Sequence, residues 1–152
     1  MILGAYKNQL CLADWRYRKK RINIDRRLQQ GLNAEYIEQD TSVLQQTRQQ
    51  LDEYLKRKRK SFDVPLLMVG TDFQKQVWQG LIAIPYGKTC SYLQLAKNIG
   101  NGKAVRAVAS ANAANALSIL IPCHRIIGSD GSLTGYAGGL EMKTYLLNLE
   151  DA

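Results

Sequence analysis

One of the chain's three cysteines, Cys123, stands directly before its single histidine, His124, and Arg125 follows. Cysteine reacts as its thiolate, which a nearby base or a positive charge favours at neutral pH. Neighbours in sequence need not face each other, however, because on a strand His124 would point away from the Cys123 side chain. Free cysteine is also among the residues most often buried, so an isolated pair indicates a structural cysteine as readily as a nucleophile. The flanking sequence must decide between the two.

The segments around this pair are short, apolar and bounded by turn residues. Residues 118–121 predict a strand that ends at Pro122, and Ile126-Ile127 predict a second strand before the turn at 128–131. This pattern predicts a short hairpin with the cysteine at its corner. The glycine-rich loop at 133–139 follows, where glycine permits close approach of a backbone to a ligand. Tyr136 within the loop favours a packed loop over a simple linker.

The C-terminal residues 141–150 predict a helix, because Met142, Tyr145, Leu146 and Leu149 recur at helical spacing. Glu150 lies at the end of this helix, where the helix dipole disfavours a carboxylate. Two interpretations follow: Glu150 is solvated, or it has a specific partner such as His124.

Two further helices are predicted upstream, joined by a tight turn at Asn101-Gly102. The first begins at a capping box, Ser91 with Gln94, and the second covers the alanine-rich residues 103–112 with Arg106 near its start. This pair has the form of a helix-turn-helix, whose second helix lies on DNA. An ordinary helical hairpin packed on a core explains the pattern equally well.

A second capping box, Thr71 with Gln74, opens a predicted core helix that Pro85 follows. The apolar stripe of this helix consists of Phe73, Val77, Trp78, Leu81 and Ile82.

From Thr71 to Glu150 the chain resembles the O6-alkylguanine-DNA alkyltransferases, the methylated-DNA–protein-cysteine methyltransferases. The matching pieces occur in the family's order and spacing: Phe73-Gln-Lys-Gln-Val-Trp78, Ile84-Pro85, Ser91-Tyr92, Lys103-Ala-Val-Arg-Ala-Val108, Asn115, Ile121-Pro-Cys-His-Arg125, Gly135-Tyr136 and Gly138-Gly139. The resemblance implies repair of double-stranded DNA by transfer of an alkyl group from a flipped-out O6-alkylguanine, and from O4-alkylthymine, to Cys123. It implies no cofactor and no metal.

The resemblance also implies a role for individual residues around the acceptor Cys123. His124 corresponds to the base that reaches the thiol through a water, and Glu150 to the carboxylate that orients the histidine. Tyr92 corresponds to the residue that hydrogen-bonds the flipped base. Asn115 corresponds to the residue that braces the turn before the active site.

Other positions correspond to the DNA contact and the active-site loop. Arg106 matches the side chain that enters the duplex, and Ala107 and Ser110 are expected to face DNA from the same helix. Pro122, Arg125 and Tyr136 complete the active-site turn and the loop over the guanine pocket.

The sequence departs from the family pattern at Ala116 and Ser118, where proline is common, and at Ala137, where some relatives have serine. The first two departures predict a looser turn.

The expected product is a thioether, which has no easy hydrolysis step, so each molecule acts once. Cys11 and Cys90 are unsuited to resolving it, because thiol exchange acts on disulfides.

We expect an α+β protein with two domains in its 152 residues. Residues 1–68 predict a small α/β domain, a shortened form of the family's ribonuclease-H-like domain, with a hairpin of residues 2–6 and 9–13, a helix over 43–55 and a strand over 62–68. Residues 69–152 predict a helical, winged-helix-like domain that carries the helix-turn-helix and the active site.

Composition favours a polyanionic partner, since the net charge is +8. Residues 1–68 contain 14 basic and eight acidic residues, and their basic clusters, 16–21 and 56–60, could contact phosphate or form solvated faces. We expect a cytoplasmic protein with reduced thiols, because the number of cysteines is odd and we find no membrane segment or signal peptide. With one histidine and three scattered cysteines, a structural zinc site is not expected. We expect a monomer in solution, with clustering along DNA left open.

Two other classes of function would use fewer of these features. A DNA-binding regulator with an incidental cysteine leaves Tyr136, Glu150 and the Pro-Cys-His corner without a joint role. A thiol hydrolase that uses Cys123 and His124 leaves the helix-turn-helix unexplained.

Overall fold

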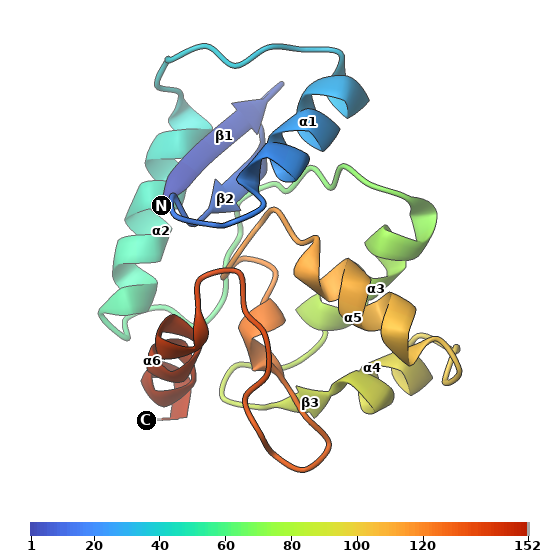
Figure 1. The fold of residues 1–152 in the computed structure, drawn as a ribbon. Helices are drawn as coiled ribbons and strands as arrows, with labels where there is room; N and C mark the ends of the chain where they lie inside the picture. Colours follow the sequence, from blue (N-terminus) through green and yellow to red (C-terminus); the bar gives the residue numbers. More distant parts are fainter. Residues whose placement is uncertain (152) are drawn as a thin grey trace.

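The computed structural model describes residues 1–151. The N-terminal half consists of an antiparallel hairpin, β1 (Ile2–Tyr6) and β2 (Gln9–Asp14), and two helices, α1 (Arg21–Leu32) and α2 (Ser42–Leu55). In Figure 1 the hairpin lies between these helices. The predicted hairpin is confirmed, and Lys7 and Asn8 at its turn both have positive φ, as a tight two-residue turn requires. The predicted helix over 43–55 is confirmed as α2.

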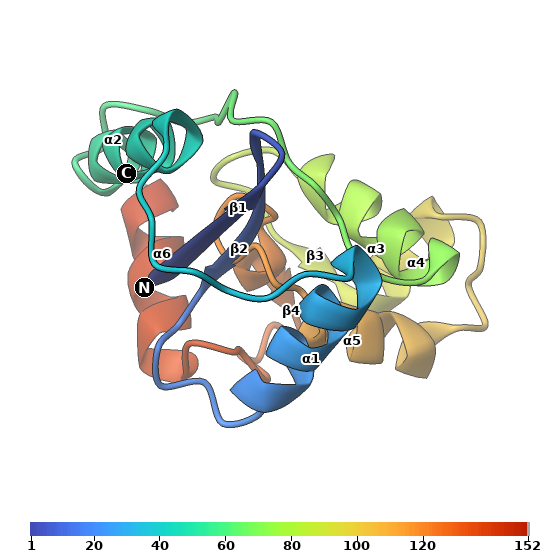
Figure 2. The ribbon, with the colours of Figure 1, turned by 90° about the horizontal axis from the view of Figure 1, so that it is seen from above.

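The C-terminal half is mainly helical, as expected. It contains α3 (Asp72–Ile82), β3 (Cys90–Ser91), α4 (Tyr92–Asn98), α5 (Val105–Ala113), the short 3-10 helix η1 (Cys123–Arg125), β4 (Ile126–Ile127) and α6 (Leu140–Asp151). Figure 2 shows α3, α4 and α5 grouped on one side of the molecule, with α6 on the other side next to α2. The helix pair α4 and α5 confirms the predicted helical hairpin.

Three predictions about extended structure were wrong. Residues 118–121 form a turn, with Ile119 at a φ of 73°, instead of a strand. The hairpin at the cysteine is absent, because β4 pairs in parallel with β3, so Ile126 lies opposite Cys90. Residues 62–68 contribute one isolated bridge, Leu66 to Leu10, because Pro65 has no N–H to extend a ladder.

Smaller differences concern the helices. α1 has only two buried residues, Ile24 and Leu28, and was not predicted. At the start of α4 only half of the capping box forms, since the Gln94 side chain donates to Asn98 instead. Tyr145 and Ile82, placed in buried stripes by their spacing, are exposed.

Both halves contribute to one hydrophobic core. It contains Leu10 and Ala13 of β2, together with Val77 and Trp78 of α3 and Cys123 itself. The Trp78 indole donates to the Ala111 carbonyl at 2.9 Å, which ties α3 to α5 inside this core. Cys123 therefore lies at the junction of the two halves. No helix among residues 1–151 has both the length and the apolar character needed to cross a membrane.

The complete capping box at α3 generates a stability prediction. The Thr71 hydroxyl accepts from the Gln74 N–H at 3.1 Å, and the Gln74 side chain accepts from the Thr71 N–H at 2.9 Å. Thr71→Ala is expected to lower the free energy of unfolding by about 1 kcal/mol, measured by urea denaturation. Thr71→Ser, which keeps the hydroxyl, serves as the control, and an equal loss in both variants would contradict a capping effect.

Candidate active site

Cys123 is the first residue of η1 and is only 3% exposed. Asn115 holds it from the preceding turn: its side-chain amide donates to the Ile121 carbonyl at 2.9 Å and to Cys123 Sγ at 3.2 Å. The Asn115 side-chain oxygen accepts from the Leu117 N–H at 2.9 Å. One amide side chain thus fixes the turn that replaces the predicted strand and fixes the sulfur as well. Pro122 is buried between these residues.

The environment of the sulfur keeps it protonated at rest. Burial raises the pKa of the Cys123 thiol. The hydrogen bond from Asn115 and the positive charges of Arg18 and Lys143 lower this pKa, but by less than burial raises it. The balance lies above the ordinary cysteine value, so a base must remove the proton before the sulfur becomes a strong nucleophile.

His124 is fully buried beside Cys123, and its Nε2 lies 2.8 Å from Glu150 Oε1. This confirms the expectation that Glu150 has a specific partner. Burial raises the pKa of Glu150, but hydrogen bonds from His124 and Arg125 outweigh this and hold it well below its usual range. An ionised carboxylate can only accept, so Nε2 carries the hydrogen and Nδ1 is the basic nitrogen.

The His124 imidazole is neutral at rest, because burial lowers its pKa more than the Glu150 carboxylate raises it. Its Nδ1 is buried and has no hydrogen-bond partner among residues 1–151. A neutral histidine with a free basic nitrogen next to a protonated cysteine can act as a general base.

Glu150 is the centre of a buried polar cluster that compensates its position at the end of α6. Arg125 donates to both carboxylate oxygens, from Nε and from Nη2, each at 2.9 Å, and its Nη1 donates to the Ile84 carbonyl at 2.7 Å. The Tyr54 hydroxyl donates to Glu150 Oε1 at 2.6 Å. These contacts join η1, α6, α2 and the end of α3.

Sequence reasoning missed Tyr54, because its position in α2 carries no signal beyond an apolar stripe. It also missed Lys143, which is fully buried on α6 and whose Nζ donates to the Thr134 carbonyl at 2.7 Å. Lysine is rarely buried completely, and its position one turn before Leu146 gives no sequence signal for this.

The loop over 128–139 brings Tyr136 against His124. The rings of Tyr136 and His124 meet edge to face with centroids 6.4 Å apart. Tyr92, the first residue of α4, accepts a hydrogen bond from the Thr134 hydroxyl at 3.4 Å. The loop that carries Tyr136 thus also contacts Tyr92.

The outer face of α5 is exposed at Arg106, Ala107 and Ser110, while Val108 and Ala111 face the core. Ser110 lies four residues after Arg106 and three after Ala107, so the three positions form one face of the helix. The small side chains of Ala107 and Ser110 let a flat or grooved partner approach the backbone closely.

The basic cluster at 16–21 divides into two kinds of side chain. Arg18 and Arg21 pair with acidic residues: Arg18 Nη1 lies 3.1 Å from Asp14, and Arg21 Nε lies 2.9 Å from Asp25. Arg16, Lys19 and Lys20 are exposed.

The cluster at 56–60 is similarly mixed. Lys56 pairs with Asp52 at 2.8 Å and Arg59 with Glu53 at 2.7 Å.

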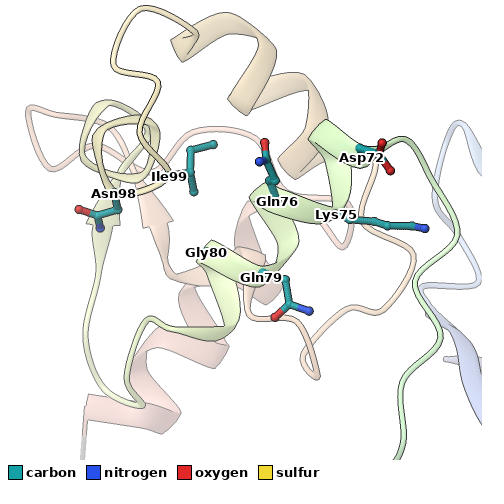
Figure 3. A pocket seen from close by; sticks show the side chains of 7 residues that line it. All are labelled: Asp72, Lys75, Gln76, Gln79, Gly80, Asn98 and Ile99. Carbon is teal, nitrogen blue, oxygen red and sulfur yellow. The ribbon is translucent and has the colours of Figure 1, made fainter.

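An open groove of about 510 Å³ lies between α3 and α4, away from the expected site residues. Figure 3 shows the residues that line it, which are Asp72, Lys75, Gln76, Gln79, Gly80, Asn98 and Ile99. Among residues 1–151, no three His, Cys, Asp or Glu side chains are grouped so that they could hold a metal ion.

Comparison with known proteins agrees with this geometry. Residues 72–152 match the family of the 6-O-methylguanine DNA methyltransferase DNA-binding domain, and residues 18–68 match the ribonuclease-like domain of the same proteins. The methylated-DNA–protein-cysteine methyltransferase of Methanosarcina barkeri is 44% identical over 99% of this chain and 90% of its own. The constitutive enzyme of Bacillus subtilis is 50% identical over 78% of this chain and 71% of its own.

The solved structures give the same result. A crystal structure of Mycobacterium tuberculosis OGT in complex with DNA superposes with a TM-score of 0.84, at 37% identity, over 98% of this chain and 84% of that one. The chain therefore belongs to the methylated-DNA–protein-cysteine methyltransferases, with the family's N-terminal domain and its helical C-terminal domain.

The buried carboxylate generates a prediction about pH. Glu150→Gln is expected to lower the free energy of unfolding by roughly 3–5 kcal/mol at pH 7, because Arg125 loses its counter-charge while it stays buried. The pKa of Glu150 is lower in the folded than in the unfolded state, so its contribution is complete above about pH 5 and is lost as the pH falls below about 4.

The measurement is denaturant unfolding of wild type and Glu150→Gln at pH 7 and pH 3. The difference between them should shrink at the lower pH. Glu141→Gln, at an exposed position in the first turn of α6, should show little change at either pH. A difference that stays constant with pH would contradict the ionised state of Glu150.

Proposed function

We propose that this protein repairs DNA by moving the alkyl group of O6-alkylguanine to the sulfur of Cys123, once per molecule. The observation that carries the proposal is a buried pair of neighbouring residues: Asn115 donates to the Cys123 sulfur, and His124, the next residue, is oriented by Glu150 through Nε2 and keeps an Nδ1 that is unpartnered within the described part of the chain. A regulator has no need of this buried base, and a hydrolase has no need of the exposed face on α5.

The proposed reaction is an in-line displacement at the alkyl carbon. The proton of the Cys123 thiol passes towards Nδ1 of His124, through a water in the arrangement that the family implies. The thiolate then forms a bond to the alkyl carbon as the bond between that carbon and guanine O6 breaks. The guanine leaves with the bonding electrons and takes up a proton, assisted by the Tyr92 hydroxyl. The product is a stable thioether, so the sulfur is not regenerated.

A nucleotide inside a duplex cannot reach a buried sulfur, so we propose that it is flipped out of the stack. Extrusion costs a few kcal/mol, and less at a poorly paired lesion. Arg106 is exposed on the outer face of α5, where it can enter the duplex and fill the gap. The same face, with Ala107 and Ser110, forms the proposed DNA contact, a proposal that the DNA complex of the Mycobacterium tuberculosis relative supports.

The remaining parts of the proposal concern the setting of the reaction. We propose two domains, 1–68 and 69–152, in a monomer that acts in the cytoplasm, where thiols stay reduced. The three free cysteines support a reducing compartment. We propose O4-alkylthymine as a second substrate. We also propose that several copies of the protein cluster along one DNA molecule.

The decisive test is the intact mass of the protein after it is mixed with duplex DNA that contains O6-methylguanine. Wild type is expected to gain one methyl group, on the Cys123 peptide, and to saturate at one per protein. Cys123→Ala should gain none but still bind the duplex, whereas Cys11→Ser and Cys90→Ser should react like wild type. Methyl transfer to Cys123→Ala, or no mass gain by wild type, would refute the proposal.

The role of Arg106 is tested by comparing two substrates. Arg106→Ala is expected to slow transfer from duplex DNA by about tenfold or more, a loss of about 1.4 kcal/mol, because the extruded base is no longer replaced in the stack. Transfer from free O6-benzylguanine, which needs no extrusion, should be unchanged. Lys97→Ala removes a cation from α4 and serves as the control. Equal slowing of Arg106→Ala on both substrates would exclude the insertion role.

A further inference from the structure

The active-site loop is attached to the N-terminal half by a residue that the proposed reaction does not use. The Tyr17 hydroxyl donates to the Gly138 carbonyl at 2.8 Å, across 121 positions of the chain. Gly138 also lies tightly against Trp15, because a Cβ at this glycine would lie 2.7 Å from the indole nitrogen. In Figures 1 and 2 the connection from β2 to α1 runs beside the loop that leads into α6.

A row of aromatic rings connects this contact to the catalytic histidine. Ring centroids are 6.1 Å apart for Tyr17 and Trp15, 6.2 Å for Trp15 and Tyr136, and 6.4 Å for Tyr136 and His124. Rings at these separations attract each other in tilted and edge-to-face arrangements. A shift of the loop at Gly138 would therefore displace Tyr136 relative to His124.

The carbonyl groups on the two sides of Tyr136 have separate anchors. Lys143 Nζ donates to the Thr134 carbonyl at 2.7 Å before Tyr136, and Tyr17 donates to the Gly138 carbonyl after it. Lys143 belongs to α6 in the C-terminal half, whereas Tyr17 belongs to the N-terminal half. The loop needs both anchors to keep Tyr136 in one place.

The residue after Tyr17 contacts Asn115, the residue that holds the cysteine. Arg18 Nη1 donates to the Asn115 carbonyl at 2.8 Å, and Asn115 in turn holds Cys123 Sγ. Residues 15–18 thus contact both the loop that carries Tyr136 and the residue that hydrogen-bonds the sulfur. This gives the N-terminal half a direct connection to the reacting group, in addition to its share of the core.

We propose that Tyr17 is a positioning residue for alkyl transfer, which holds the active-site loop at Gly138 and thereby keeps Tyr136 against His124. This inference rests on the proposed function. Tyr17 contacts neither Cys123 nor His124, so its effect is exerted through Gly138 and Tyr136.

The test is Tyr17→Phe, which removes the hydroxyl and keeps the ring beside Trp15. Single-turnover transfer from duplex O6-methylguanine is measured over a range of DNA concentrations, and amide hydrogen exchange is measured in residues 133–139. The plateau rate is expected to fall roughly twofold to tenfold, as for loss of one hydrogen bond, with the half-saturating DNA concentration unchanged. Exchange in the loop should become faster.

Tyr145→Phe is the matched control, since Tyr145 is half exposed on α6 and should react like wild type. A contact that only stabilises the fold would lower the melting temperature of Tyr17→Phe and leave the plateau rate as it was. That result, or a rise in half-saturating DNA concentration without a fall in plateau rate, would overturn the inference. Wild type that transfers no methyl group would instead refute the proposed function.

Discussion

The buried carboxylate of Glu150 is the group on which the rest of this structure depends. It lies where a helix dipole disfavours it, and it is 4% exposed, so it requires close compensation by donors. Arg125, His124 and Tyr54 provide that compensation from two other helical segments. Because the carboxylate must accept from His124, it also determines which imidazole nitrogen is basic. The same interaction therefore stabilises the protein and prepares the reaction.

The sulfur is controlled in a similar way, by groups that fix backbone and chemistry together. The Asn115 side chain bonds two backbone groups of the turn, the Ile121 carbonyl and the Leu117 N–H, and also donates to Cys123 Sγ, so a change in the turn moves the sulfur. The looser turn expected from Ala116 and Ser118 stays a prediction, but the backbone groups of both residues have partners in β2. Ala116 O accepts from Ala13 N and Ser118 N donates to Ala13 O, so β2 holds the turn from outside.

Sequence patterns predicted the features that depend on local spacing. Residue types a few positions apart predicted the capping box at Thr71 and the helix pair around Asn101-Gly102. The partner of Glu150 was predicted because a carboxylate is unfavourable at the C-terminus of a helix. The pairing of β4 with β3 depends instead on contacts over 36 positions, from Cys90 to Ile126, and could not be predicted locally. Tyr54 lies in a helix whose periodicity is correct, but its buried partner Glu150 is 96 positions away. Lys143 also fits its helix, but its partner is a backbone carbonyl of the loop before α6, which residue types do not reveal.

The shared core has a consequence for how such a protein can change over evolutionary time. Leu10 and Ala13 pack in the same cluster as Cys123. Arg18 donates to the carbonyl of Asn115, the residue whose side chain hydrogen-bonds the cysteine. A domain that only tethers a catalytic unit can be replaced or lost in descendants with little effect. Here the smaller half packs in the same cluster as Cys123, so a substitution on either side of this shared packing alters the surroundings of the sulfur.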